Sequence, residues 1–342
     1  MSKYIVFSDL HLHNWGDFAT TDNDTGNSRL TNQISALEDI LSVARSERRT
    51  VLFLGDLFHQ RGRVATNVFN SAMDVFDSYK DVEVIAIEGN HDNVTNSINS
   101  ISSLEPLALL PKFNLVQSHS YFEWNGDSIM AVSYGDEYEE LKNEIKGHRA
   151  TLLLGHLGVE GSMGAGKSKL DGPFSVGDLC SDNYGLVLLG HYHKRQFLND
   201  NSLYVGNPIS QDFGDDGQDK GYFTFETSDG KVVEDSLKYT PLNYPRFIKI
   251  TTDNVDEYED LDELSKNNYV RLVVPEKVLE DRSIDTTDLS PNIRVEKQIE
   301  TVSESRLDID SSTDTISIVK TWAKEFQPEN EDVIIKQIQK VL

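Results

Sequence analysis

The sequence predicts a layered α/β fold with parallel pairs of strands, on three observations. Apolar runs of strand type alternate with amphipathic helical segments over residues 4–88, which gives a β-α-β-α-β order. Several of these runs, there and later in the chain, end in a glycine that is followed at once by Asp, Asn or His. Open α/β sheets bind ligands outside the carboxyl ends of their strands, so these polar residues mark a functional site.

The elements before residue 240 follow from periodicity and turn signals. Helical spacing of apolar residues predicts helices over 30–49, 64–79 and 137–146. Asn125-Gly126-Asp127 is a hairpin signal between two short strands, 113–116 and 129–132. The expected strands are 4–7, 50–55, 82–88, 113–116, 129–132, 152–154, 186–189, 202–205, 221–226 and 231–239.

The second half of the chain suggests smaller parts after a first domain of residues 1–240. Two prolines in 240–245 indicate a linker, because proline cannot continue a strand ladder. Segments 246–251, 254–266 and 269–274 predict a small β-α-β module within residues 241–300, and the polar stretch 301–312 predicts a flexible linker. Two amphipathic segments follow in 313–342, which either dock a partner or pack on their own domain. The apolar residues proposed for docking are Ile318, Trp322, Phe326, Ile335 and Ile338.

Composition limits the classes of function. No run approaches the roughly 18 apolar residues that span a bilayer, the N-terminus enters a strand without a signal peptide, and the single cysteine agrees with a reducing compartment. We therefore expect a cytoplasmic protein without membrane contact. The net charge of −25 argues against nucleic-acid binding unless basic side chains gather at the site or a partner supplies positive charge.

Seven side chains at the predicted strand ends form two candidate metal positions. Asp9, His11, Asp56 and His193 would hold one cation, and Asp56, Asn90, His156 and His191 the other, with Asp56 bridging. Imidazole, carboxylate and amide ligands suit Mn²⁺, Fe²⁺ or Zn²⁺ better than Mg²⁺. Two such ions can activate water for an in-line displacement at phosphorus, so the pattern predicts phosphoester hydrolysis.

Other polar residues near these strand ends are candidates for substrate contact. His91 is predicted to hydrogen-bond a phosphate oxygen or protonate the leaving oxygen, with Asp92 orienting its ring, and His59 is a second phosphate contact. Trp15 either stacks on a base or serves as a packing lid. The basic candidates for the DNA backbone are Arg61, Arg63, Lys167, Lys169, Lys194 and Arg195.

Residues 161–168, Gly-Ser-Met-Gly-Ala-Gly-Lys-Ser, match the P-loop pattern. A P-loop needs a strand running into its first glycine and a helix starting at its lysine. Here the predicted strand ends at Gly155, and Gly172-Pro173 would stop a helix. We therefore interpret the segment as a glycine loop that carries Lys167 and Lys169 towards phosphate groups.

Five motifs together resemble the calcineurin-like metallophosphoesterases, and within them the SbcD-type DNA repair nucleases, a group that includes the recombination endonuclease subunit of T-even phages. The histidine in Leu57-Phe58-His59 is typical of the SbcD-type nucleases, and residues 204–208 resemble the return strand of the family. The motifs are Ser8-Asp9-Leu10-His11, Gly55-Asp56-Leu57-Phe58-His59, Gly89-Asn90-His91-Asp92, Gly155-His156 and Gly190-His191-Tyr192-His193.

This resemblance implies a sandwich of two mixed β-sheets flanked by helices, with a small α+β capping domain that orients DNA and C-terminal helices that dock on an ATPase coiled coil. It implies a two-metal nuclease that uses Mn²⁺, with Mg²⁺ as the alternative. The expected activities are a 3′→5′ exonuclease on duplex DNA and an endonuclease on single strands. The expected partners are an SbcC-type ABC ATPase and a second copy of the chain. A phage source, suggested by compactness and acidity, would place the protein in the host cytoplasm.

Two other functions use the same residues. The first is a phosphomonoesterase for a small molecule or a protein, which would cleave an aryl phosphate but not DNA. The second is a non-catalytic scaffold that retains the ligands as a relic. The complete ligand set argues against the scaffold.

Overall fold

The computed structural model describes residues 1–164, 168–251, 254, 260–275 and 290–298, and all structural statements below concern these residues. Of the two units into which the chain divides, the larger contains the described residues up to Val274 and residues 290–296. The expected linker 301–312 and helices 313–342 lie outside the described residues. The same holds for Lys167, Ile318, Trp322, Phe326, Ile335 and Ile338.

Two mixed sheets form the core of the larger unit, as predicted. In the first sheet the order is β12-β11-β1-β2-β3-β4, with β13 also paired to β11. Strands β1 to β4 are parallel and β11 runs antiparallel to β1. Its strands are β1 (Ser2–Phe7), β2 (Thr50–Phe53), β3 (Val84–Ile87), β4 (Phe113–Val116), β11 (Gly221–Ser228), β12 (Lys231–Val232) and β13 (Lys238–Pro241).

The second sheet has the order β5-β6-β7-β8-β10-β9. Its inner strands β6, β7, β8 and β10 are parallel, and β5 and β9 are antiparallel edges. Its strands are β5 (His119–Trp124), β6 (Asp127–Val132), β7 (Ala150–His156), β8 (Tyr184–Gly190), β9 (Gln196–Asn199) and β10 (Ser202–Tyr204).

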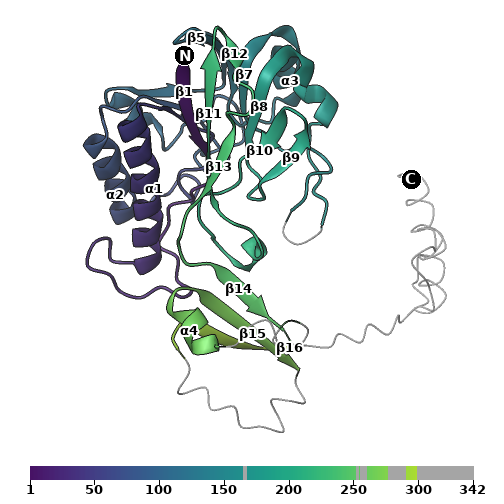
Figure 1. The fold of residues 1–342 in the computed structure, drawn as a ribbon. Coiled ribbons are helices and arrows are strands. Elements are labelled where there is room, and N and C mark those ends of the chain that lie inside the picture. The colour runs from purple at the N-terminus through teal and green to yellow at the C-terminus, as the bar shows by residue number, and fades with distance from the viewer. Residues whose placement is uncertain (165–167, 252–253, 255–259, 276–289, 299–342) are drawn as a thin grey trace, which may run out of the picture. The chain divides into compact units, whose positions relative to one another are not determined.

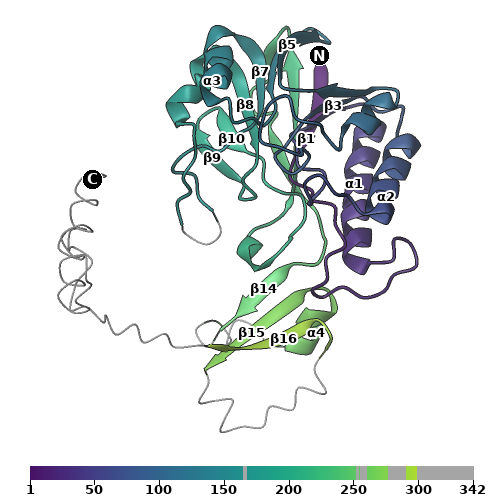
Figure 2. The same ribbon diagram turned by 180° about the vertical axis from the view of Figure 1, so that it is seen from behind.

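The two sheets face each other, and helices cover their outer faces. Alternate residues of the strands, such as Val6 and Leu52 from the first sheet and Leu154 and Leu188 from the second, form one buried cluster between the sheets. Helices α1 (Ser28–Glu47) and α2 (Thr66–Ser78) pack on the outer face of the first sheet. Helix α3 (Tyr138–Gly147) packs on the outer face of the second, so the helices lie on opposite flanks (Figures 1 and 2). This helix–sheet–sheet–helix order confirms the predicted sandwich.

Local sequence explains the long helix α1. Asn27 caps its start, because its side-chain oxygen accepts hydrogen bonds from the backbone of Arg29 and Leu30. Apolar residues at helical spacing then face the sheet, and Arg48 ends the helix in the left-handed conformation. None of the described helices is both long enough and apolar enough to cross a membrane.

A third, small sheet has the order β14-β15-β16 and carries helix α4. Phe247 and Tyr269 of this sheet form a buried aromatic cluster with Phe18 and the partly buried Phe213. The Arg29 guanidinium lies 4.8 Å from the centre of the Phe247 ring and 5.6 Å from that of Tyr269. The elements are β14 (Phe247–Ile250), α4 (Leu261–Lys266), β15 (Tyr269–Pro275) and β16 (Ile293–Gln298).

Several predicted elements differ from the structure at polar or short strands. The hairpin at Asn125-Gly126 joins β5 to β6 and not 113–116 to β6. The sequence pattern missed the edge strand β5, and residues 113–116 belong to the other sheet. The expected strand 231–239 is two short strands separated by a turn at Asp235, whose φ is 57°. Pro241 still pairs with Gly221, so the expected linker begins inside β13. Strands β9 and β16 were not expected, and α4 begins at Leu261 instead of 254.

Candidate metal centre

The seven predicted ligands meet where β1, β2, β3, β7 and β8 end. Parallel strands place their carboxyl ends at one edge of a sheet, and the two sheets face each other, so both edges contribute. Asp9, His11, Asp56 and His191 have positive φ angles of 55°, 49°, 60° and 99°, a left-handed conformation in which the backbone turns sharply after each strand.

Two of the glycines are required by close approach. A Cβ atom on Gly89 would lie 2.1 Å from Oδ1 of Asp56, and one on Gly190 would lie 2.1 Å from Oγ of Ser8. No side chain fits at such distances. The strand–glycine–ligand pattern therefore has a physical cause: only glycine lets neighbouring strand ends come close enough for their ligands to converge.

The ligand atoms form two groups that share Asp56. In the first group, Nε2 of His11 lies 3.1 Å from Nε2 of His193, 3.5 Å from Oδ2 of Asp56 and 3.9 Å from Oδ1 of Asp9. Metal–ligand bonds of about 2.0–2.2 Å place neighbouring ligand atoms roughly 3 Å apart, so this spacing suits one cation.

In the second group, Oδ1 of Asn90 lies 2.9 Å from Nδ1 of His191 and 3.2 Å from Nε2 of His156. Nε2 of His156 is also 3.5 Å from Oδ2 of Asp56, the same oxygen that approaches His11. Asp56 thus occupies the position of a bridging carboxylate. The structure brings all seven predicted ligands together.

The protonation of His156 tests whether this donor set fits a cation. Its Nδ1 lies 2.6 Å from the carbonyl oxygen of Leu54, so Nδ1 carries a proton and Nε2 faces the oxygens of Asn90 and Asp56. Burial is the largest single influence and lowers the pKa of His156, but Asp56, Asp9 and the Leu54 carbonyl together raise this pKa to about 9. The position therefore attracts a positive charge, and a divalent cation fits it.

Asp56 itself stays ionised. Burial would raise the pKa of its carboxyl group, but His156, His11 and His91 hold this pKa well below its usual range. A carboxyl group bridges two cations only when it is ionised, so these neighbours keep Asp56 in the form that binds metal.

His59 and His91 lie together beside the first group of ligands. Their rings are nearly parallel, with an interplanar angle of 20° and centres 5.4 Å apart, and the His91 ring meets His11 edge-on at 4.7 Å. The backbone N–H of His91 donates to Oδ1 of Asp56 at 2.7 Å, and Nδ1 of its ring contacts the carbonyl oxygen of His59. These contacts place both rings next to the expected position of the substrate.

Asp92 does not contact the His91 ring, which it was expected to orient. Its buried carboxyl group accepts hydrogen bonds from the backbone N–H groups of Asp56 (2.7 Å), Gly89 (3.0 Å), Leu57 (3.0 Å) and Phe58 (3.3 Å). The carbonyl of His59, and not Asp92, contacts the His91 ring. Asp92 therefore fixes the loop that presents Asp56 instead of orienting His91.

The predicted DNA-contact residues are dispersed around the centre. Trp15 is half-buried and packs on His59 with ring centres 4.4 Å apart, as in its packing alternative. Arg61 donates to the Asn90 carbonyl and to Oδ1 of Asn96, so it supports the ligand loop. Exposed Arg195 lies over the Tyr239 ring at 3.7 Å. The others described are exposed Arg63 and Lys169 and half-buried Lys194.

The P-loop match does not have P-loop geometry in its described residues. Gly164 N–H donates to the Ser168 carbonyl at 2.9 Å and Leu170 N–H to the Ser162 carbonyl at 2.8 Å, so Ser162–Gly164 pairs with Ser168–Leu170. Ser168–Leu170 is not helical, whereas a P-loop would have a helix there. Met163 and Lys169 form the ladder bridge between these two segments.

Sequence reasoning missed a buried polar network under the ligands. Lys220 donates at 2.6 Å to Asp215, at 2.6 Å to Asn207 and at 3.1 Å to the carbonyl of His193. The amide of Gln211 donates at 2.7 Å to the carbonyl of Asp9. Lys220 follows an acidic loop, a pattern typical of a solvated surface, so composition gave no signal of its burial.

Arg29 was also missed. Its guanidinium donates to the carbonyl oxygens of Gln211 (2.5 Å) and Asp17 (3.2 Å) and lies 5.0 Å from the centre of the Trp15 ring. Burial lowers its pKa to about 10, so Arg29 remains charged at neutral pH.

A double set of carboxylate, imidazole and amide ligands between two facing sheets defines a metal-dependent phosphoesterase centre. The sequence matches the family described as calcineurin-like phosphoesterase over residues 2–195, and the chain belongs to this family.

Among curated proteins, the chain is similar to the SbcD subunit of the nuclease SbcCD of Staphylococcus epidermidis. The two are 21% identical over 255 residues, which cover 64% of this chain and 66% of that protein, slightly less than two thirds of its length.

The chain shares less sequence identity with the solved structures than with this relative. A novel archaeal phosphodiesterase is 17% identical with a TM-score of 0.37, over 70% of this chain and 99% of that one. A dimetal phosphatase from Danio rerio is 13% identical with a TM-score of 0.41, over 66% and 92%.

Proposed function

We propose that this chain is a two-metal DNA nuclease that uses Mn²⁺, with Mg²⁺ as the alternative. It acts as a 3′→5′ exonuclease on duplex DNA and as an endonuclease on single strands. The observation that carries the proposal is the pair of imidazoles, His59 and His91, beside the ligands of the first metal position.

The charge of this pair favours a phosphodiester over a phosphomonoester. Burial and the neighbouring His91 and His13 lower the pKa of His59 to about 4, so His59 is neutral at pH 7. A monoester carries about 1.5 to 2 negative charges at that pH, and a diester carries only one. Arg61, a cation that could offset the second charge, is engaged with the ligand loop. Neither His59 nor Arg61 is therefore placed to offset the second charge of a monoester.

The cations supply Lewis acidity and an activated water when they are bound. Asp9, His11, Asp56 and His193 would hold one, and Asn90, His156 and His191 would hold the other with Asp56. Since Nδ1 of His91 donates to the His59 carbonyl, Nε2 is left for the substrate. In its protonated form Nε2 hydrogen-bonds a non-bridging oxygen or protonates the leaving oxygen. His59 donates a second hydrogen bond to the phosphate.

The proposal includes the partners that the resemblance implies. Similarity to the SbcD subunit of the nuclease SbcCD supports DNA as the substrate and an SbcC-type ABC ATPase as the partner. The module of residues 241–300 acts as a cap that orients DNA, residues 313–342 dock on the ATPase, and the nuclease domain forms a homodimer. The protein works in the cytoplasm, or in the host cytoplasm if a phage encodes it.

The test compares substrates on the purified full-length chain with Mn²⁺. We expect cleavage of end-labelled duplex and single-stranded oligonucleotides, and loss of at least 100-fold in rate for His91→Ala with metal stoichiometry unchanged. His148→Ala is the matched control, because His148 stacks on Tyr121, away from the ligands. Hydrolysis of p-nitrophenyl phosphate without DNA cleavage would identify a phosphomonoesterase and refute the proposal.

A further inference from the structure

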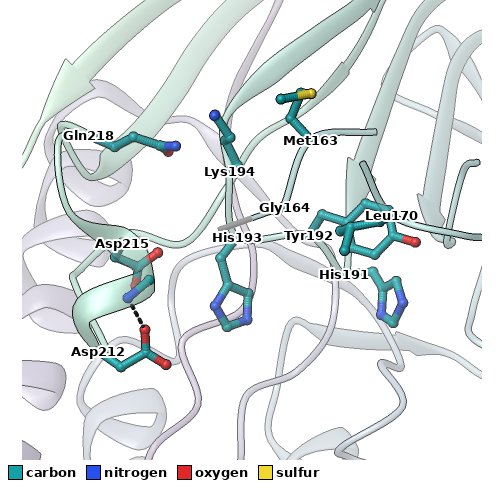
Figure 3. A pocket seen from close by; sticks show the side chains of 11 residues that line it. Met163, Gly164, Leu170, His191, Tyr192, His193, Lys194, Asp212, Asp215 and Gln218 are labelled. Atoms are coloured by element: carbon teal, nitrogen blue, oxygen red, sulfur yellow. Dashed lines mark hydrogen bonds between the residues drawn. The ribbon is translucent and has the colours of Figure 1, made fainter. Parts of the chain in front are cut away.

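A cavity of about 230 Å³ adjoins the metal centre, and the mechanism above leaves it unused. His191 and His193 form its inner end, so a group inside the cavity lies directly beside the ligands of both metal positions (Figure 3). One wall comes from the paired segments that contain Met163 and Leu170, and the opposite wall from the loop that contains Asp212 and Gln218. A substrate phosphate held at the metals would therefore place its neighbouring nucleotide at this cavity.

The first wall is apolar and held in place. Met163 and Leu170 face the cavity together with Tyr192. The side-chain amide of Gln196 clamps the backbone of Met163 by accepting from its N–H at 2.8 Å and donating to its carbonyl at 2.9 Å. The hydroxyl of Tyr192 donates to the Asp171 carbonyl at 3.0 Å. A fixed apolar wall beside an aromatic ring suits the flat face of a nucleobase.

The opposite wall is polar and carries the carboxyl groups of Asp212 and Asp215, and the cationic side chain of Lys194 also lines the cavity. Asp215 is buried and paired with Lys220, so its charge is offset. Asp212 is exposed, and its Oδ1 accepts from the N–H of Gly214 at 2.6 Å, which fixes the carboxylate at the start of a 3₁₀ turn. In Figure 3 this carboxylate lies across the cavity from Leu170 and Tyr192. Next to the Asp212 carboxylate an anionic phosphate would be repelled, whereas the amino group of a base would be attracted.

We propose that this cavity, lined by Met163, Leu170, Tyr192 and Asp212, is a subsite for the base next to the scissile phosphate, and that Asp212 selects bases with an amino group. Adenine, cytosine and guanine present an amino donor to this carboxylate. Thymine presents carbonyl oxygens on both sides of its one imide N–H, so it meets Asp212 with like partial charges. This inference rests on the proposed nuclease function and adds a preference to it.

The test uses short single-stranded oligonucleotides that differ only in the base flanking one susceptible linkage. Their kcat/KM values with Mn²⁺ are compared, and binding is measured in parallel by fluorescence anisotropy on the same sequences with a hydrolysis-resistant linkage. We expect thymine to be disfavoured about tenfold in both assays, the effect of one charge-assisted hydrogen bond against a repulsive contact.

Asp212→Asn should abolish this preference, because an amide can donate to a thymine carbonyl and still cap the turn. Asp216→Asn is the matched control: it removes the same charge from the same loop, and Asp216 contacts the backbone of Lys249 outside the cavity. Asp216→Asn should keep the tenfold preference.

The outcomes separate this inference from the function on which it rests. Cleavage of DNA with equal efficiency and equal affinity for all bases would overturn the subsite and leave the nuclease intact. A preference that persists in Asp212→Asn would also overturn it. Binding that disfavours thymine, from a chain that cleaves no phosphodiester, would support the subsite and refute the nuclease. Failure to bind any oligonucleotide would overturn both.

Discussion

Replacing Glu88 by glutamine should stabilise the protein by about 3 kcal/mol at pH 8 and by less than about 1 kcal/mol at pH 5. Glu88 follows β3 and is only 1% exposed, and Oε2 of its carboxyl group has no hydrogen-bond partner among the described residues. Burial, with a smaller contribution from Glu105, raises its pKa from 4.5 to about 7. The folded state thus holds the proton more tightly than the unfolded state does.

The sign of the pH dependence follows from linkage. Below about pH 4.5 the carboxyl group is protonated in both states and costs nothing. As the pH rises towards 7, the unfolded state ionises first, so the free energy of unfolding falls, and above 7 the loss is complete. A pKa shift from 4.5 to about 7 corresponds to a loss of about 3 kcal/mol in the free energy of unfolding. Glutamine is neutral at every pH and avoids this loss.

The assay is urea unfolding of wild type and Glu88→Gln at pH 5 and pH 8, with EDTA present so that cation binding does not contribute. At pH 8 the variant should be about 3 kcal/mol more stable, with a Tm higher by about 5 to 10 °C. Glu105→Gln is the control, since Glu105 is an exposed neighbour and should shift stability by less than about 1 kcal/mol. Equal effects of Glu88→Gln at both pH values would refute the reasoning.

Two further predictions concern the support of the ligands. In Lys220→Met, the described hydrogen-bond donors left to the buried Asp215 are Asn207 and Gln211. The variant should therefore lower the free energy of unfolding in urea by about 3 kcal/mol and weaken Mn²⁺ binding through His193. The double variant with Asp215→Asn should recover most of the stability. A single-variant cost below about 1 kcal/mol would contradict this. Gly89→Ala places a methyl group 2.1 Å from Oδ1 of Asp56 and should reduce Mn²⁺ affinity at least 100-fold by calorimetry. Gly147→Ala, where a methyl group meets nothing within 4 Å, should bind Mn²⁺ normally, and an equal loss there would show that the effect is not local.

The layers of the fold and the gathering of the ligands were predictable because their signals are local. Each buried strand is a short apolar run, and each ligand follows its strand within a few residues, so sequence order alone places it at the correct edge. Strand β5 was missed although three of its six residues are aromatic, because the hairpin turn was paired with the more apolar run 113–116 instead. The split between β12 and β13 depends on a left-handed Asp235, which its residue type does not specify.

The hydrogen bonds that hold the ligand loops in place could not be predicted, because they join residues that are far apart in the sequence. Asp92 was placed beside His91 from adjacency, yet it binds the loop of Asp56, 36 positions away. The contact of Arg29 with Gln211 spans 182 positions. Hydrogen bonds of this kind depend on the finished packing of both sheets, and a single sequence does not encode them as a pattern.

The position of Arg29 couples two parts of the larger unit. Its guanidinium lies against Phe247 and Tyr269 of the small sheet and donates to the carbonyl of Gln211, whose amide in turn holds the carbonyl of Asp9. A tilt of the small sheet would therefore shift the backbone of the metal ligand Asp9 through only two side chains, Arg29 and Gln211. Thermodynamic reciprocity then requires that cation binding bias the tilt of that sheet by the same free energy with which the tilt biases cation affinity.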